Sequence, residues 1–385
     1  MNTKFFLDLS KNCFLFWLSR KLDYPILPPD TVQMNFSFKC NLSCKMCSME
    51  AQGRLLESEG KQTEIDSETF RKTIRETVEL GTKTFLFIGG EPFLRSDLFD
   101  LVGYAKGLGL NTVIVTNGVL LTEENISRCF KNGADWLSIS IDSASKENFS
   151  KIRGVDVLDR IISNVKTLNH MKKSQGQETP RLVTVCTIMD DNIHELMDVV
   201  GLCRELGIAR IIFQPVVANN IDQTQRQDLA PGFVPKTRLN QLDESIDRLI
   251  VFKKESLENF DFVANSIKQL KLIKGYFRGK VSPRAYPCYA GYNRVQIVQE
   301  GKLYFCVNQQ QHVANFGDIK KDTLKDMWYS KKARSYRQLI RKCRYPCLQW
   351  CSYRDEFIQL QDAFYKKLVF GVLKRGQNGR GAANV

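Results

Sequence analysis

The sequence predicts an α/β fold: a partial (β/α)6 barrel of parallel strands, followed by a small cysteine-rich domain. Two observations support this prediction. Six apolar segments have the length and composition of strands, and helical patterns separate them. Strands joined by helices of ten or more residues form parallel βαβ units, and six strands are too few to close an eight-stranded barrel. In addition, five of the twelve cysteines are concentrated between residues 288 and 351.

The expected strands are 32–38, 82–88, 111–116, 136–141, 181–188 and 209–216. The expected helices between them are 66–80, 96–108, 122–132, 156–173 and 192–206. Parallel βα folds carry their functional groups at the carboxyl ends of the strands. Four short polar motifs, CNLSCKMC, GGEP, TNG and SISID, each lie at one of these ends. The sequence therefore predicts one site at this edge of the barrel.

Five regions are expected along the chain. They are an apolar, basic lead segment (1–31), the barrel (32–216), a linker with a helix at 238–256 and an irregular stretch (217–282), the cysteine-rich domain (283–355), and a C-terminal helix with a disordered tail (356–385). Phe5, Leu9, Cys13, Phe16 and Trp17 recur at helical spacing in the lead segment. This pattern favours a helix packed across the core, and the alternative is a peripheral helix on a membrane surface.

Composition narrows the class of protein. The chain has 385 residues, of which 43% are hydrophobic and 25% are charged. No uncharged apolar run is long enough to span a bilayer, and the N-terminus does not have the pattern of a signal peptide. We therefore expect a cytoplasmic protein, in which cysteines bind metal instead of forming disulfides. The net charge of +14 is compatible with a solvated basic surface, an acidic or phosphorylated substrate, an acidic electron donor, an anionic membrane or RNA.

Three cysteines in one loop are the most informative motif. Cys40, Cys44 and Cys47 have the spacing CX3CX2C. Three thiolates in one loop can hold three irons of a 4Fe–4S cluster and leave the fourth iron open to a non-protein ligand. The alternative is a zinc site, but structural zinc usually takes two pairs of ligands, and no second pair lies nearby in the sequence.

With the GGEP motif forty residues later, this loop resembles the radical S-adenosylmethionine (SAM) superfamily. The resemblance implies a SAM-binding 4Fe–4S cluster on these three cysteines and a partial barrel fold. It also implies that the GGEP segment contacts the SAM amine, that Ser140 and Arg153 hold the SAM carboxylate, and that Asn117 and Asp142 lie near the ribose or support the loop. The residues expected at the SAM site are Met46, Gly89, Gly90, Glu91, Pro92, Asn117, Ser140, Asp142, Arg153 and Gln214.

The C-terminal cysteines resemble the SPASM/twitch extension of that superfamily. Cys288 and Cys306 flank an expected hairpin, with a glycine five residues before Cys306, which matches the first half of the pattern. The second half is shorter, because Cys343, Cys347 and Cys351 are the last cysteines of the chain. Five thiolates suffice for one auxiliary 4Fe–4S cluster but not for two. Cys288, Cys306 and Cys351 are the firmer ligand choices, and Cys343 and Cys347 compete for the fourth position.

The resemblance implies an oxidoreductase that cleaves SAM and removes a hydrogen atom from a C–H bond. The expected partners are a peptide or small-molecule substrate and a reducing partner such as flavodoxin or ferredoxin, and no DNA. Peptide maturation by oxidation or cross-linking is one outcome. The alternatives are dehydrogenation, epimerisation or C–C bond formation on a sugar, nucleoside or lipid, an electron carrier with two clusters and no catalysis, and an RNA-modifying enzyme. The auxiliary cluster would accept an electron from the substrate or bind it.

Overall fold

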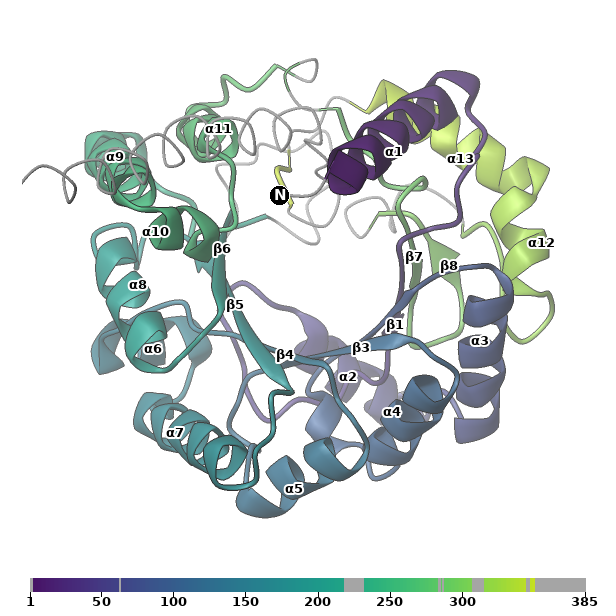
Figure 1. Cartoon of the computed structure of the whole chain (residues 1–385), viewed down its shortest axis with the longest axis horizontal. Coiled ribbons are helices and arrows are strands. Elements are labelled where there is room, and N and C mark those ends of the chain that lie inside the picture. The colour runs from purple at the N-terminus through teal and green to yellow at the C-terminus, as the bar shows by residue number, and fades with distance from the viewer. Residues whose placement is uncertain are drawn as a thin grey trace, which may run out of the picture.

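A computed structural model describes residues 3–61, 64–217, 232–282, 285, 287–306, 315–343 and 347–349 of the chain. Parallel strands curve into an open barrel, and helices cover its outer side (Figure 1). The barrel strands are β1 (Thr31–Asn35), β2 (Thr84–Ile88), β3 (Asn111–Thr116), β4 (Trp136–Ile139), β5 (Arg181–Ile188) and β6 (Arg210–Pro215). Neighbours in the sheet are neighbours in the sequence, from β1 to β6. The prediction of an open barrel of six parallel strands is confirmed.

The sheet continues beyond β1 into the cysteine-rich region. Strand β7 (Arg294–Ile297) pairs parallel with β1, and β8 (Leu303–Tyr304) pairs antiparallel with β7. Thr31 therefore lies opposite Thr84 on one side and Arg294 on the other. The hairpin expected between Cys288 and Cys306 exists, but it extends the barrel sheet instead of forming a separate one.

The five helices predicted between the strands are present. They are α3 (Ser67–Glu79), α4 (Leu98–Gly107), α5 (Glu123–Lys131), α7 (Leu158–Ser174) and α8 (Leu196–Glu205). Two further helices, α2 (Met49–Ser58) and α6 (Lys146–Arg153), were not predicted. Helix α6 has clear end signals, because the Ser145 hydroxyl accepts a hydrogen bond from the Asn148 amide and Gly154 ends the helix in the left-handed conformation.

The stretch after the expected helix at 238–256 is not irregular, so that prediction is wrong. Helix α9 (Leu239–Glu255) is followed by α10 (Leu257–Phe262) and α11 (Ile267–Phe277). The side chains of Ser256 and Ser266 cap these two helices. The cysteine-rich region contains two further helices, α12 (Leu324–Tyr329) and α13 (Lys331–Lys342). Residues 218–231 of the expected linker and the expected C-terminal helix and tail (356–385) lie outside the described residues.

Side-chain alternation divides the sheet into a core face and a cavity face. On β5, Leu182, Cys186 and Ile188 are buried under the helices, whereas Val183 and Val185 face the barrel interior. This two-residue period fixes which positions of each strand can meet a ligand. The thiols expected in the core are indeed buried: Cys13, Cys129, Cys186 and Cys203.

The lead segment forms α1 (Thr3–Leu22), and one side of it packs on the protein. Cys13 and Phe16 are buried, whereas Phe14 and Trp17 are 55% and 43% exposed and stack on each other. Within the described residues, no helix combines the length and the apolar character needed to cross a membrane.

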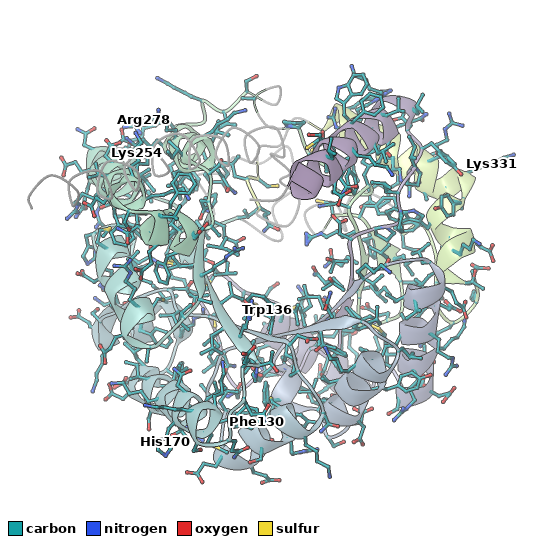
Figure 2. The ribbon with its side chains drawn as sticks, viewed as in Figure 1. Phe130, Trp136, His170, Lys254, Arg278 and Lys331 are labelled. Atoms are coloured by element: carbon teal, nitrogen blue, oxygen red, sulfur yellow. The ribbon has the colours of Figure 1, made fainter. Side chains whose placement is uncertain are left out.

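Some of the basic side chains on the outer helices point into solvent. Lys254 and Lys331 lie at the rim of the molecule, away from the barrel interior (Figure 2). His170 is also exposed on the outer side of α7. These three side chains are exposed, as expected for a solvated basic surface.

Candidate active site

The cysteine loop leaves the carboxyl end of β1 and is fixed by backbone hydrogen bonds to the GGEP turn. The Gly90 amide donates to the Ser37 carbonyl at 2.8 Å, and the Glu91 amide donates to the Lys39 carbonyl at 2.8 Å. Lys39 is the residue before Cys40. The turn after β2 thus sets the position at which the first cysteine emerges.

Both glycines are required because the two backbones lie so close together. A Cβ atom on Gly90 would stand 1.9 Å from the Lys39 carbonyl oxygen. A Cβ atom on Gly89 would stand 2.8 Å from the Ser37 carbonyl oxygen, and Gly89 has a φ of 150°. The paired glycines therefore allow the close approach of the two backbones.

The end of α6 holds the other side of the loop. The Lys45 amide donates to the Ile152 carbonyl at 2.9 Å. Gly154, with a φ of 79°, passes so close to the loop that a Cβ there would lie 2.8 Å from the Ser43 carbonyl oxygen. The unpredicted helix α6 is therefore part of the support of the cysteine loop.

The three cysteines of this loop line one cavity and are accessible from it. Burial raises the pKa of the Cys40 thiol to about 11 and also raises that of Cys47, and the neighbouring cysteines add to both effects. A bound iron replaces the thiol proton, which offsets this cost. Among the described residues, no three Cys, His, Asp or Glu side chains converge on a single metal ion. A 4Fe–4S cluster does not require such convergence, because each cysteine binds a different iron.

The Glu91 side chain does not face the cavity. It is buried and connects the turn after β2 to the turn after β3. Its side chain is 2% exposed, and it accepts hydrogen bonds from the Thr116 hydroxyl and the Asn117 amide, both at 2.8 Å, and from the Phe93 amide at 3.2 Å. Burial raises the pKa of Glu91 to about 7 despite these donors. Pro92, also buried, starts a 3-10 helix (Pro92–Leu94). The cavity is lined by the two glycines of this motif and not by its last two residues.

Asn117 links the third strand to the cysteine loop. Its side-chain amide donates to the Asn41 side-chain oxygen at 2.8 Å, and its own oxygen accepts from the Val119 amide. Asn117 also lines the cavity. It therefore supports the loop and remains accessible to a ligand, which fits both readings of this residue.

Asp142 and Arg153 form a buried ion pair behind the cysteine loop. Asp142 is fully buried and also accepts the Thr187 amide at 2.7 Å, so it lies outside the cavity lining. Arg153 lines the cavity, and its Nη1 atom donates to the Cys44 sulfur at 3.6 Å. The guanidinium is thus held between a carboxylate and a cysteine. Its contact with a SAM carboxylate stays a prediction.

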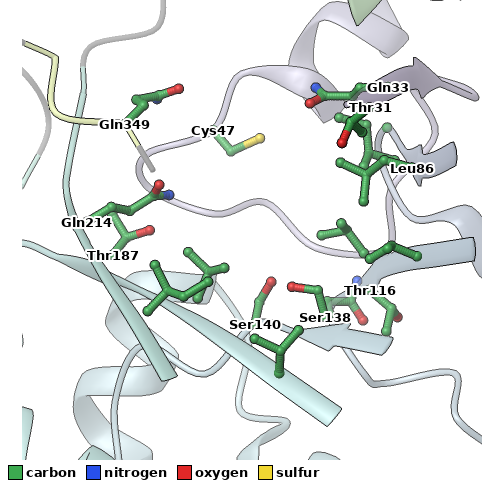
Figure 3. Close-up of a pocket in the computed structure, with 18 of the residues that line it drawn as sticks. Thr31, Gln33, Cys47, Leu86, Thr116, Ser138, Ser140, Thr187, Gln214 and Gln349 are labelled. Carbon is green, nitrogen blue, oxygen red and sulfur yellow. The ribbon is translucent and has the colours of Figure 1, made fainter. Parts of the chain in front are cut away.

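The cavity has a volume of about 800 Å³, within the usual range of ligand sites. Met46, Ser140 and Gln214, expected at the SAM site, line it together with the cysteine loop. Figure 3 shows Ser140 and Gln214 around this space, with Cys47 in the loop that borders it. Sequence reasoning missed several other lining residues: Thr31, Gln33, Thr84, Thr187, Ser266, Gln269 and Arg294. Their alternation along the strands is a signal that could have identified several of them.

The second group of cysteines belongs to the opposite edge of the sheet. Cys288 precedes the amino end of β7, and Cys306 follows the antiparallel β8, so both lie toward the edge where β1 begins. Cys343 follows α13, and Cys347 is 6% exposed. Cys351 lies outside the described residues.

An aromatic cluster adjoins this second group. The rings of Phe305 and Tyr336 are 5.2 Å apart, and Phe316 stacks on Phe305 at 4.0 Å. Burial and the nearby Cys306 thiol both raise the pKa of Tyr336. Helix α13, which carries Tyr336 and leads to Cys343, therefore packs against the end of the hairpin.

Comparison with known proteins identifies both parts of the chain. Residues 34–214 match the radical SAM superfamily, and residues 288–353 match SPASM, an iron–sulfur cluster-binding domain. A probable GTP 3′,8-cyclase of Sulfurisphaera tokodaii is 26% identical over 295 residues, covering 75% of this chain and 85% of the relative. An AdoMet-dependent heme synthase of Oleidesulfovibrio alaskensis is 34% identical over 171 residues, 44% of this chain and 41% of the relative.

Two groups of solved structures share the fold. Streptococcus suis SuiB bound to the precursor peptide SuiA has a TM-score of 0.61 at 16% identity and covers 84% of this chain and 70% of SuiB. Native anSMEcpe with bound AdoMet and a Cp18Cys peptide has a TM-score of 0.59 at 17% identity, covering 91% and 99% of the two chains. At this identity, the likeness concerns the fold alone.

The barrel, the three-cysteine loop and these matches together define an iron–sulfur enzyme that uses SAM. The chain contains a radical SAM superfamily domain and, C-terminal to it, a SPASM domain. Its cofactors are SAM and 4Fe–4S clusters.

Proposed function

We propose that this enzyme cleaves SAM reductively and removes a hydrogen atom from a C–H bond of a peptide or small molecule held inside the barrel. The observation that carries this proposal is the cavity of about 800 Å³ that the three loop cysteines border. When bound at this loop, a reduced 4Fe–4S cluster and SAM supply a 5′-deoxyadenosyl radical. Cys40, Cys44 and Cys47 would hold the cluster, and the Gly89–Gly90 backbone would contact the SAM amine.

The chain's own contribution is to position the reactants and exclude water. Apolar strand residues such as Leu86, Val113 and Val185 line the wall below the cysteine loop. A dry apolar wall gives a reactive radical few partners other than the intended C–H bond. Ser140 and Gln214 would orient SAM from the ends of their strands, while Asp142 and Glu91 would act behind the lining as positioning residues.

The auxiliary site would hold one 4Fe–4S cluster, on Cys288, Cys306 and Cys351, with Cys343 or Cys347 as the fourth ligand. Its place at the opposite edge of the sheet suits a group that meets the substrate from the far side of the cavity. There it would accept an electron from the oxidised substrate or bind the substrate. A flavodoxin or ferredoxin would deliver the electron for SAM cleavage.

Oxidative modification or cross-linking of a peptide is the first proposed outcome. A small molecule such as a nucleoside, sugar or lipid is the alternative, and the likeness to GTP 3′,8-cyclases over most of their length favours a nucleotide within that group. A peptide substrate should yield 5′-deoxyadenosine above background only when that peptide is added. A small-molecule substrate should do so without any peptide.

Anaerobic reconstitution tests the proposal. We expect roughly eight irons per chain in the wild type and roughly four after Cys40, Cys44 and Cys47 are all changed to Ala. Wild type incubated with SAM and dithionite should form 5′-deoxyadenosine, and the triple variant should form none. A wild-type protein that holds both clusters but leaves SAM intact would be an electron carrier, and the proposed function would then be wrong.

A further inference from the structure

The cavity contains a buried cation on the side away from the cysteine loop. Arg294 begins β7, is only 8% exposed and lines the cavity. Its Nη1 atom donates to the Gln33 side-chain oxygen at 3.2 Å. Its buried Nε atom has no hydrogen-bond partner, and within the described part of the chain Arg294 forms no ion pair. Buried charges are normally paired, so this guanidinium lacks the partner that its position calls for.

A second element contributes unpartnered polar atoms to the same cavity. Gln269 lies on α11 and is 1% exposed. Both its side-chain nitrogen and its side-chain oxygen lack hydrogen-bond partners among the described residues. Ser266, one turn earlier, lines the cavity as well. A buried amide with neither group satisfied is costly unless a ligand or water completes it.

Asp30 and Gln33 lie at the same end of the cavity as Arg294. Asp30 is held by its backbone, whose amide donates to the Asn293 carbonyl at 2.8 Å. Gln33 offers Arg294 a neutral oxygen only. The free edge of the guanidinium therefore remains available to an anion.

We propose that Arg294 anchors a carboxylate or phosphate group of the substrate, with Gln33 and Gln269 as neighbouring hydrogen-bonding groups. The planar fork of arginine binds both kinds of anion through two parallel hydrogen bonds. This inference rests on the proposed function, because it names the substrate class that the cavity would accept.

The position of Arg294 separates this anchor from the SAM end. Arg294 pairs in register with Thr31, the first residue of β1, whereas the cysteine loop follows the last. Four steps of about 3.3 Å along β1 put the two ends of the strand roughly 13 Å apart. The acidic group of the substrate would therefore lie about one strand length from the end of β1 at which the cysteine loop begins.

Thermal unfolding of the anaerobically prepared holoprotein tests the anchor. Sodium pyrophosphate, inorganic phosphate and succinate would each be titrated against sodium chloride at equal ionic strength. A ligand that binds only the folded state raises the unfolding temperature, so we expect a rise of a few degrees with at least one of these anions. A response to the phosphates indicates a phosphorylated substrate, and a response to succinate indicates a carboxylic acid.

Three variants locate the effect. Arg294→Met should abolish the anion-induced rise, and Arg294→Lys should retain part of it. Arg210→Met is the matched control, because Arg210 also begins a barrel strand but is exposed and outside the cavity lining, so it should respond like the wild type. Without added anion, Arg294→Met should unfold at the wild-type temperature or higher, because it removes an uncompensated buried charge.

The inference is wrong if no anion stabilises the wild type, or if Arg294→Met responds as strongly as the wild type. It is also wrong if Arg294→Met lowers the unfolding temperature by several degrees without anion, which would indicate a structural arginine. Failure of the proposed function looks different. If the wild-type protein binds the anion but forms no 5′-deoxyadenosine, the anion site is supported and the proposed function is wrong.

Discussion

Changing Gly90 to alanine should displace the cysteine loop from the barrel. The new Cβ atom would lie 1.9 Å from the Lys39 carbonyl oxygen, and the neighbour is backbone, which cannot rotate away. The loop must retreat by about 1.1 Å before the contact reaches 3.0 Å, the closest approach that real Cβ atoms show. This movement weakens the two 2.8 Å hydrogen bonds between the turn and the loop. Two hydrogen bonds and the overpacking together amount to roughly 2–6 kcal/mol of unfolding free energy.

The assay combines urea unfolding with anaerobic iron counting. Gly90→Ala should lose roughly four of the eight irons, because Cys40 directly follows the displaced Lys39, and it should form little 5′-deoxyadenosine. Gly201→Ala is the matched control: a Cβ atom on Gly201, in α8, would meet no atom within 4 Å, so alanine should stabilise the helix by up to about 1 kcal/mol. If Gly90→Ala keeps its iron and matches the control in stability, the close approach does not position the cluster.

Three further predictions concern buried charge and the second cluster. Burial raises the pKa of Glu91 from 4.5 to about 7. Between these two pH values the folded state binds more protons than the unfolded state. The unfolding free energy of the wild type should therefore fall relative to that of Glu91→Gln as the pH rises. Urea unfolding at pH 5.5 and pH 8 should show a change of about 2 kcal/mol in that difference; a constant difference would contradict the shift. Asp142→Asn leaves Arg153 buried without its carboxylate partner and should cost about 3–5 kcal/mol of unfolding free energy, whereas Asp100→Asn, at an exposed position, should cost almost nothing. Cys288→Ala should lower the iron content toward four per chain; an unchanged count would remove Cys288 from the auxiliary ligand set.

Local pattern was sufficient to predict the barrel. The β-branched and apolar runs of β3 and β5 have strand length and clear alternation, so their bounds agree with the prediction. The stretch after residue 256 was misjudged because its helices are short and its lysines obscure the apolar spacing of Leu270 and Ile273. There, serine caps and burial against the barrel outweigh weak periodicity.

The site was predictable as a set of positions but not as a set of contacts. Motifs at strand ends correctly indicated which segments meet, because parallel strands end at one edge. The sequence could not show that Glu91 turns inward toward Thr116, or that Arg153 is held by Asp142. Arg294 escaped notice for a similar reason: its place depends on pairing between β7 and β1, two segments that are far apart in the sequence.

That pairing has a consequence for how the protein is made. During synthesis, β1 leaves the ribosome long before β7. At 5–20 residues per second, the interval between the two strands is roughly 13–50 s. Throughout this interval β1 has an unpaired edge on which nascent chains of neighbouring ribosomes could assemble. Slower translation initiation, or a chaperone that binds the open edge of β1, should therefore improve the yield of intact protein. A fragment truncated before residue 283 should aggregate, because β1 would lack β7 to pair with.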